Sequence, residues 1–129
     1  MHTDFIHFLL IIMTENHITA QRIADILTVK NVAHDQKRMF GGDCFMVDEK
    51  MLIGTYKGGL MARVDPADES TFTNRNGVEA MIHGGRPMPG YLFIDPVAYE
   101  SDADLQFWVE KCLEFNPKAK ASGKKKTAK

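Results

Sequence analysis

The apolar residues in the middle of the chain fall into three short runs. They are Cys44–Val47, Met51–Tyr56 and Leu60–Val64, with the short polar segments 48–50 and 57–59 between them. Spacing of this kind predicts a three-stranded antiparallel meander with tight connections. The rest of the chain is expected to lay helices and one more hairpin against that sheet.

A helix of about fourteen residues is predicted ahead of the sheet. Thr14 can cap it, and Glu15 in the first turn favours the positive end of the helix dipole. The expected core stripe lies at helical spacing. It consists of Ile18, Arg22 by its stem, Ile26 and Val29, with Ile23 and Leu27 alongside. Residues 31–37 then break the pattern and lead into the sheet.

A short helix, a hairpin and a final helix are predicted after the meander. Asp65 and Pro66 form a strong helix start, and the segment 74–77 (Asn-Arg-Asn-Gly) supplies the stop. The hairpin pairs residues 78–82 with 91–95 across a long connection rich in glycine and proline, 83–90. The last helix begins at Ser101 and ends at Pro117, and its apolar stripe consists of Leu105, Trp108, Val109, Cys112 and Leu113.

The element order is therefore α-β-β-β-α-β-β-α, which indicates a two-layer α+β domain with an antiparallel sheet. The domain is expected to span residues 14–116, followed by a disordered Lys-rich tail at 117–129. Residues 1–13 form an extra apolar segment, too short to span a bilayer. Three interpretations of this segment are open. It is a start-site artefact, with Met13 as the real first residue; it is an element that packs on the domain or on a partner; or it is a secretion or membrane signal.

Charge divides the chain into an acidic body and a basic tail. The first 116 residues hold 10 basic and 17 acidic residues, a net charge of −7, and the tail adds six lysines and no acid. Such a body repels phosphates, so nucleic acid is expected to bind only through Lys118–Lys129. The composition is that of a folded cytoplasmic protein, with no membrane association expected.

The residue types give little support for catalysis or for a cofactor. The five histidines have no metal-ligand spacing, so no metal site is expected. Gly41 and Gly42 lack the residues that a phosphate-binding loop needs. Cys44 and Cys112 are interpreted as buried free thiols in a reducing compartment, with a disulfide as the alternative. The protein is therefore not expected to be an enzyme.

Five segments together resemble the N-terminal domain of the TfoX/Sxy competence regulators. They are 38–42 (RMFGG), 45–47 (FMV), 60–64 (LMARV), 85–91 (GRPMPGY) and 104–109 (DLQFWV). The resemblance runs from about Thr14 to Phe115, and it reaches neither residues 1–12 nor the second domain of the full regulators. It implies a secretion-chaperone-like fold in the bacterial cytoplasm. It also implies a role in transcription of DNA-uptake genes alongside the cyclic-AMP receptor protein.

The candidate interaction residues lie in or beside these segments. They are Arg38, Phe40, Gly41, Gly42, Arg63 and Arg86. The arginines either cluster as an anion or partner site or hold carboxylates such as Asp43 or Asp95, and Arg63 is expected to share the less buried sheet face with Arg38. The expected function is regulatory protein interaction, with the transcription machinery or with a second copy as partner. The alternatives are nucleic-acid binding through the tail and a chaperone-like dimer.

Overall fold

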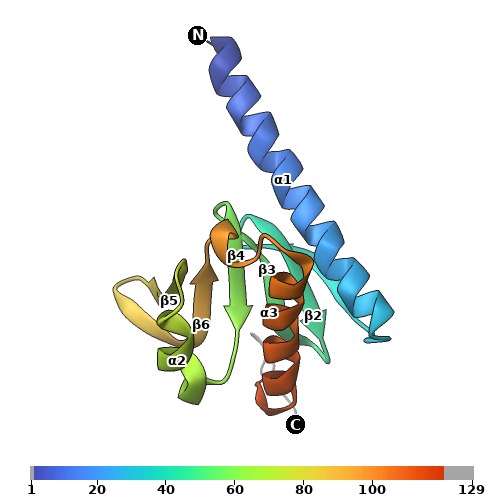
Figure 1. Cartoon of the computed structure of the whole chain (residues 1–129), viewed down its shortest axis with the longest axis vertical. Helices are drawn as coiled ribbons and strands as arrows, with labels where there is room; N and C mark the ends of the chain where they lie inside the picture. The colour runs from blue at the N-terminus through green and yellow to red at the C-terminus, as the bar shows by residue number, and fades with distance from the viewer. Residues whose placement is uncertain (1, 121–129) are drawn as a thin grey trace.

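The computed structural model describes residues 2–120 as three helices packed on a six-stranded antiparallel sheet (Figure 1). The sheet order is β1-β2-β3-β4-β6-β5. The helices are α1 (His2–Val29), α2 (Glu69–Thr73) and α3 (Asp102–Phe115). The strands are β1 (Asp35–Met39), β2 (Gly42–Val47), β3 (Lys50–Tyr56), β4 (Gly59–Arg63), β5 (Val78–His83) and β6 (Arg86–Ile94). This confirms the predicted α+β class and the antiparallel sheet.

The strand β1 was not predicted. Its first four residues, 35–38 (Asp-Gln-Lys-Arg), are all exposed, and it pairs only with β2, from Asp35 opposite Met46 to Met39 opposite Gly42. A polar edge strand shows no apolar alternation, so the sequence placed most of it in a connecting segment. The charged side chains protect this sheet edge from pairing with another chain.

The meander formed by β2, β3 and β4 agrees with the prediction. An irregularity that the sequence did not reveal places Phe45 opposite Ile53 but Met46 opposite Met51. Leu52 is therefore an extra residue in β3, and both Leu52 and Ile53 belong to the core cluster under the helices.

The long connection predicted between the last two strands is wrong. Gly84 and Gly85, with φ of 60° and 79°, form the whole turn, and His83 pairs with Arg86. A two-residue turn with positive φ at both positions matches the twist of the flanking strands. Pro87 suggested a loop, yet it lies in β6 opposite Ile82.

Both predicted helix starts after the meander are confirmed. A carboxylate oxygen of Asp65 accepts a hydrogen bond from the backbone N–H of Ala67, and a 3-10 turn, Pro66–Asp68, leads into α2. The Oγ of Ser101 accepts a hydrogen bond from the N–H of Asp104 and caps α3.

The predicted start of the first helix at Thr14 is wrong, because α1 is continuous from His2. The apolar run before Thr14 contains no Gly or Pro to stop a helix. The predicted stripe is also rotated: Ala20, Ile23 and Leu27 are buried, whereas Ile18 and Val29 are exposed by 53% and 86%. The N-terminal half of α1 extends away from the sheet (Figure 1).

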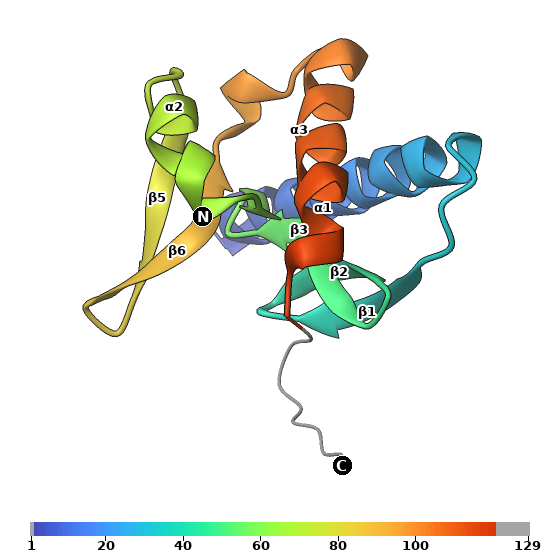
Figure 2. The ribbon, with the colours of Figure 1, turned by 90° about the horizontal axis from the view of Figure 1, so that it is seen from below.

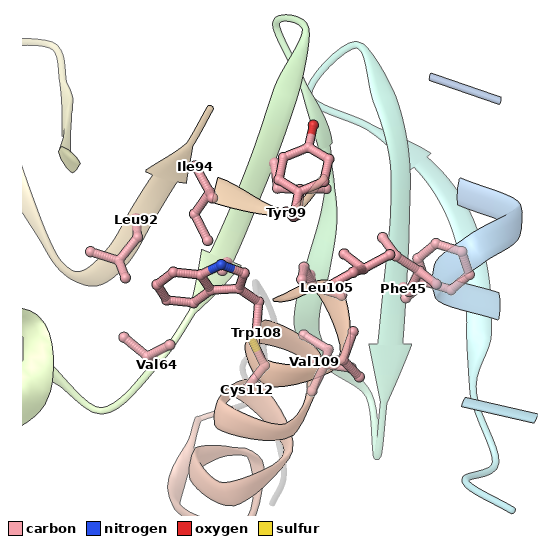
Figure 3. Close-up of a cluster of buried hydrophobic side chains, with 14 of the residues drawn as sticks. Phe45, Val64, Leu92, Ile94, Tyr99, Leu105, Trp108, Val109 and Cys112 are labelled. Carbon is pink, nitrogen blue, oxygen red and sulfur yellow. The ribbon is translucent and has the colours of Figure 1, made fainter. Parts of the chain in front are cut away.

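The main core lies between the sheet and the helices (Figure 3). Trp108 is 1% exposed, and its ring packs edge-on against Phe72 with centroids 5.4 Å apart. The indole N–H donates a hydrogen bond of 3.0 Å to the carbonyl of Ala98. Trp108 is therefore a core anchor, as predicted.

The opposite sheet face carries a second cluster, which we call the sulfur cluster. It consists of the buried residues Cys44, Met46, Met51, Met61 and Met81. Every side chain packed in this cluster, buried or partly buried, comes from a strand, whereas α1, α2 and α3 contribute to the other core. Figure 2 shows α1 and α3 on the same side of β2 and β3.

Candidate functional site

The candidate residues between Arg38 and Gly42 form the turn between β1 and β2. Phe40 and Gly41 occupy its two central positions, with φ of 57° and 78°, and Met39 pairs with Gly42 to close it. Positive φ is ordinary for glycine but costs a bulky side chain about 1–2 kcal/mol. Phe40 is 54% exposed, so the turn presents an aromatic residue at the end of the sheet.

Thr55 of β3 holds this turn against the sheet. Its buried Oγ1 accepts a hydrogen bond of 2.9 Å from the backbone N–H of Asp43. A Cβ on Gly42 would overlap the carbonyl oxygen of Thr55, so only glycine fits there without movement. Gly42 therefore allows close packing of its backbone on Thr55, whereas Gly41 allows the positive φ that the turn requires.

Arg38 and Asp43 face each other across β1 and β2, and their charged groups are 3.6 Å apart. The predicted ion pair with Asp43 is confirmed. Arg38 is 76% exposed, so the pair contributes little to stability. A hollow of about 340 Å³ adjoins it, lined by Asn16 and His17 of α1 together with Arg38, Gly41, Gly42, Asp43 and Thr55.

The remaining two arginines lie elsewhere. Arg63 is half-buried on the face of the sulfur cluster, with its guanidinium 5.3 Å from the ring centroid of Tyr91 and 6.0 Å from that of Phe115. It donates a hydrogen bond of 3.1 Å to the carbonyl of Lys120. Arg86 is exposed beside the turn between β5 and β6.

The three arginines therefore do not form one site. Arg38 adjoins the α1 side of the sheet, because its strand neighbour Met39 packs in the opposite cluster. The expectation that Arg38 and Arg63 share a face is wrong. Three strand spacings separate β1 from β4, about 14 Å. Asp95, the other carboxylate considered, caps the 3-10 turn Pro96–Ala98 by accepting a hydrogen bond from Val97 N–H.

Burial suppresses the reactivity of both cysteines. Both are free thiols, so the disulfide alternative is wrong. Desolvation raises the pKa of Cys44 to about 11, opposed by the nearby charge of Lys37, and raises the pKa of Cys112 to about 12. A thiol must ionise to act as a nucleophile, so neither is activated at neutral pH.

Within residues 2–120, no three His, Cys, Asp or Glu side chains are placed to hold a metal ion. Among the described helices, none combines the length and apolarity that a membrane span requires.

One protein-family model matches most of the chain, including the turn between β1 and β2. The family model described as TfoX N-terminal domain matches residues 31–116. The chain belongs to this family. The TfoX N-terminal match begins just before β1 and ends at Asn116, so it includes all six strands, α2 and α3. None of the curated proteins matches the chain.

The sequence missed the sulfur cluster entirely. A signal was present, because six of the eight methionines lie in or beside the strands of that face. Single short runs hide this pattern, since alternate positions of neighbouring strands gather only when the sheet forms.

Proposed function

We propose that this TfoX N-terminal domain is a non-enzymatic regulatory module in the bacterial cytoplasm that binds a protein of the transcription machinery through the turn between β1 and β2. The observation that supports this is the exposed Phe40 in a left-handed conformation. A non-glycine residue held at positive φ is often part of a functional site.

The surroundings of Phe40 suit protein recognition. Phe40 stands two residues after Arg38, whose guanidinium is exposed, and its chain neighbour Gly41 lines the hollow of about 340 Å³. Aromatic and arginine side chains dominate the binding energy of protein interfaces. The hydrogen bond from Asp43 N–H to Thr55 fixes the turn, so little conformational entropy is lost when a partner binds.

We further propose that the module contributes to the control of competence genes alongside the cyclic-AMP receptor protein. The test is the affinity of the purified chain for that receptor bound to promoter DNA, measured by calorimetry. Phe40→Ala should weaken binding by about thirtyfold, as expected for loss of an aromatic interface anchor.

Ile82→Ala is the matched control, because Ile82 is 67% exposed on β5, at the opposite edge of the sheet. This variant should bind like the wild type. Equal affinity of the wild type and Phe40→Ala would exclude the turn as the binding surface. Absence of any binding by the wild type would exclude this receptor as the partner.

A further inference from the structure

The sulfur cluster is buried although it includes no helix residue. Its five side chains are between 1% and 7% exposed. The partly buried side chains around it are Met39, Tyr56, Met88, Tyr91 and Phe93. The strands thus gather one thiol and four thioethers in a place where water has little access.

Two of the sulfur atoms have the spacing of ligands on one metal ion. The thiol of Cys44 donates a hydrogen bond to the Sδ of Met46, and the two sulfur atoms are 3.9 Å apart. Two sulfurs that each lie about 2.3 Å from one ion, as in zinc–thiolate sites, reach this separation at an angle of about 116°. That angle is close to the value for three ligands in a plane.

The sheet register supplies further sulfurs on the same face. Met46 lies directly opposite Met51. Cys44 lies opposite Gly54, and Gly54 lies opposite Met61, so no side chain stands between Cys44 and Met61. A Cβ on Gly54 would press on the backbone of Asp43 and Cys44. Glycine at position 54 therefore leaves the sheet face between Cys44 and Met61, both members of the sulfur cluster, without an intervening side chain.

We propose that the sulfur cluster binds a soft monovalent cation, Cu(I), through the Cys44 thiolate, the Met46 thioether and a third thioether from Met61 or Met51. Thiolate and thioether ligands favour soft metals, which are Cu(I), zinc and the iron of iron–sulfur clusters. On binding, the thiol loses its proton to solvent, one Cu–S bond forms to the thiolate, and the thioethers donate lone pairs without a change of oxidation state.

Charge favours a monovalent ion over Zn²⁺. One thiolate and one Cu(I) give a neutral buried site, whereas Zn²⁺ would leave a positive charge that no second anion in the cluster neutralises. This inference is independent of the role of Phe40, which lies at the β1–β2 turn and is not part of the cluster.

The experiment is competition with the chromophoric Cu(I) chelator bicinchoninate, using the reduced full chain without oxygen. The wild type should withdraw one equivalent of Cu(I), and Cys44→Ala should bind at least about tenfold more weakly, since even outer-shell ligand partners contribute that much. Cys112→Ala is the matched control: this cysteine is equally buried, but it lies in the core under the helices. It should bind like the wild type.

Conservative variants keep the test valid if Cys44→Ala does not fold. Met46→Leu and Met61→Leu preserve volume and should weaken binding while retaining the fold. X-ray absorption should show only sulfur ligands at about 2.3 Å. The proposal is overturned if the wild type leaves the chelate intact, if these variants all bind like the wild type, or if nitrogen or oxygen ligands are found.

Discussion

Gly42 of β2 lies so close to Thr55 of β3 that a Cβ at position 42 would overlap the carbonyl oxygen of Thr55. The neighbouring N–H of Asp43 donates to the Thr55 hydroxyl over 2.9 Å. These two contacts join the turn that carries Phe40 to the centre of the sheet. The position of the exposed Phe40 therefore depends on the buried Thr55 and on the absence of a side chain at Gly42.

Gly42→Ala should therefore destabilise the domain by about 3 kcal/mol, because a methyl group forced against backbone cannot be accommodated by a rotamer change. Gly41→Ala should cost only about 1 kcal/mol, since its cost is the positive φ alone and the space around it is open. Urea unfolding followed by Trp108 fluorescence measures both values. Equal losses for the two variants would contradict the close packing.

Local patterns in the sequence were sufficient for most of the fold. The meander, the caps at Asp65 and Ser101 and the Trp108 stripe all follow from contacts between residues close in the chain. The errors occurred where the outcome depends on distant partners. Strand β1 is held only by its pairing with β2, and the core face of α1 is selected by the sheet beneath it.

The candidate site shows the same limit. The sequence singled out residues 38–42, and the structure gives each a definite role in the turn. The sequence alone could not show that Arg38 and Arg63 lie on opposite faces of the sheet, because β1 was not recognised as a strand. The sulfur cluster combines β2, β3, β4 and β5, and no single segment contains its pattern.

Trp108→Phe should destabilise the domain by about 1–3 kcal/mol. The phenyl ring keeps part of the packing on Phe72 but lacks the N–H that donates to the Ala98 carbonyl, which would lose its partner. Thermal unfolding followed by circular dichroism measures the loss. Phe107→Leu is a useful comparison, because Phe107 is only partly buried and makes no such hydrogen bond, so a smaller loss is expected. A larger loss for Phe107→Leu would argue against the role assigned to the indole.

The two thiols should react with Ellman's reagent at pH 8 only when the protein unfolds. Burial raises the pKa of Cys44 to about 11 and that of Cys112 to about 12, so the native thiolate fraction is very small. The extent of reaction should follow the urea unfolding curve. Rapid reaction of one thiol in the native protein would show that its segment opens locally.

The same pKa shifts predict a loss of stability at alkaline pH. A group whose pKa is higher in the native state contributes its full stabilisation below the unfolded value of 9.0 and loses it as the pH rises toward the native value. The free energy of unfolding should therefore fall between about pH 9 and 11. Cys44→Ala should show a shallower fall over that range, and an identical slope would contradict the burial of this thiol.

Removal of residues 1–12 should leave stability within about 0.5 kcal/mol of the full chain. Among the residues of α1 whose burial is described, Ala20 is the first buried one, and Ile6 and Leu10 are 56% and 55% exposed. Thr14 would then be placed to cap the shortened helix. Leu27→Ala is the comparison, with an expected loss of about 2–5 kcal/mol. A large loss on truncation would instead support packing of this segment on the domain.

Two truncations at the other end separate stability from nucleic-acid binding. Disorder was predicted for the whole tail, 117–129, but its first residues are ordered: a 3-10 turn covers Asn116–Lys118, and the carbonyl of Lys120 accepts a hydrogen bond from Arg63. Residues 121–129 lie outside the described residues. Asn116, in contrast, donates from Nδ2 to the Val47 carbonyl and accepts at its carbonyl from Lys50 Nζ. Truncation after Phe115 should therefore cost about 1–3 kcal/mol, whereas truncation after Lys120 should leave the urea midpoint unchanged.

The shorter truncation also tests binding through the tail. It removes four of the six tail lysines and leaves Lys118 and Lys120. The Nζ of Lys118 lies 3.5 Å from a carboxylate oxygen of Asp65. Because the first 116 residues carry a net charge of −7, any retention on immobilised DNA at low salt should be lost with those four charges. Retention that survives this truncation would require a basic surface on the folded body. Two arginines of that body, Arg38 and Arg63, lie on opposite faces of the sheet and so do not combine into one.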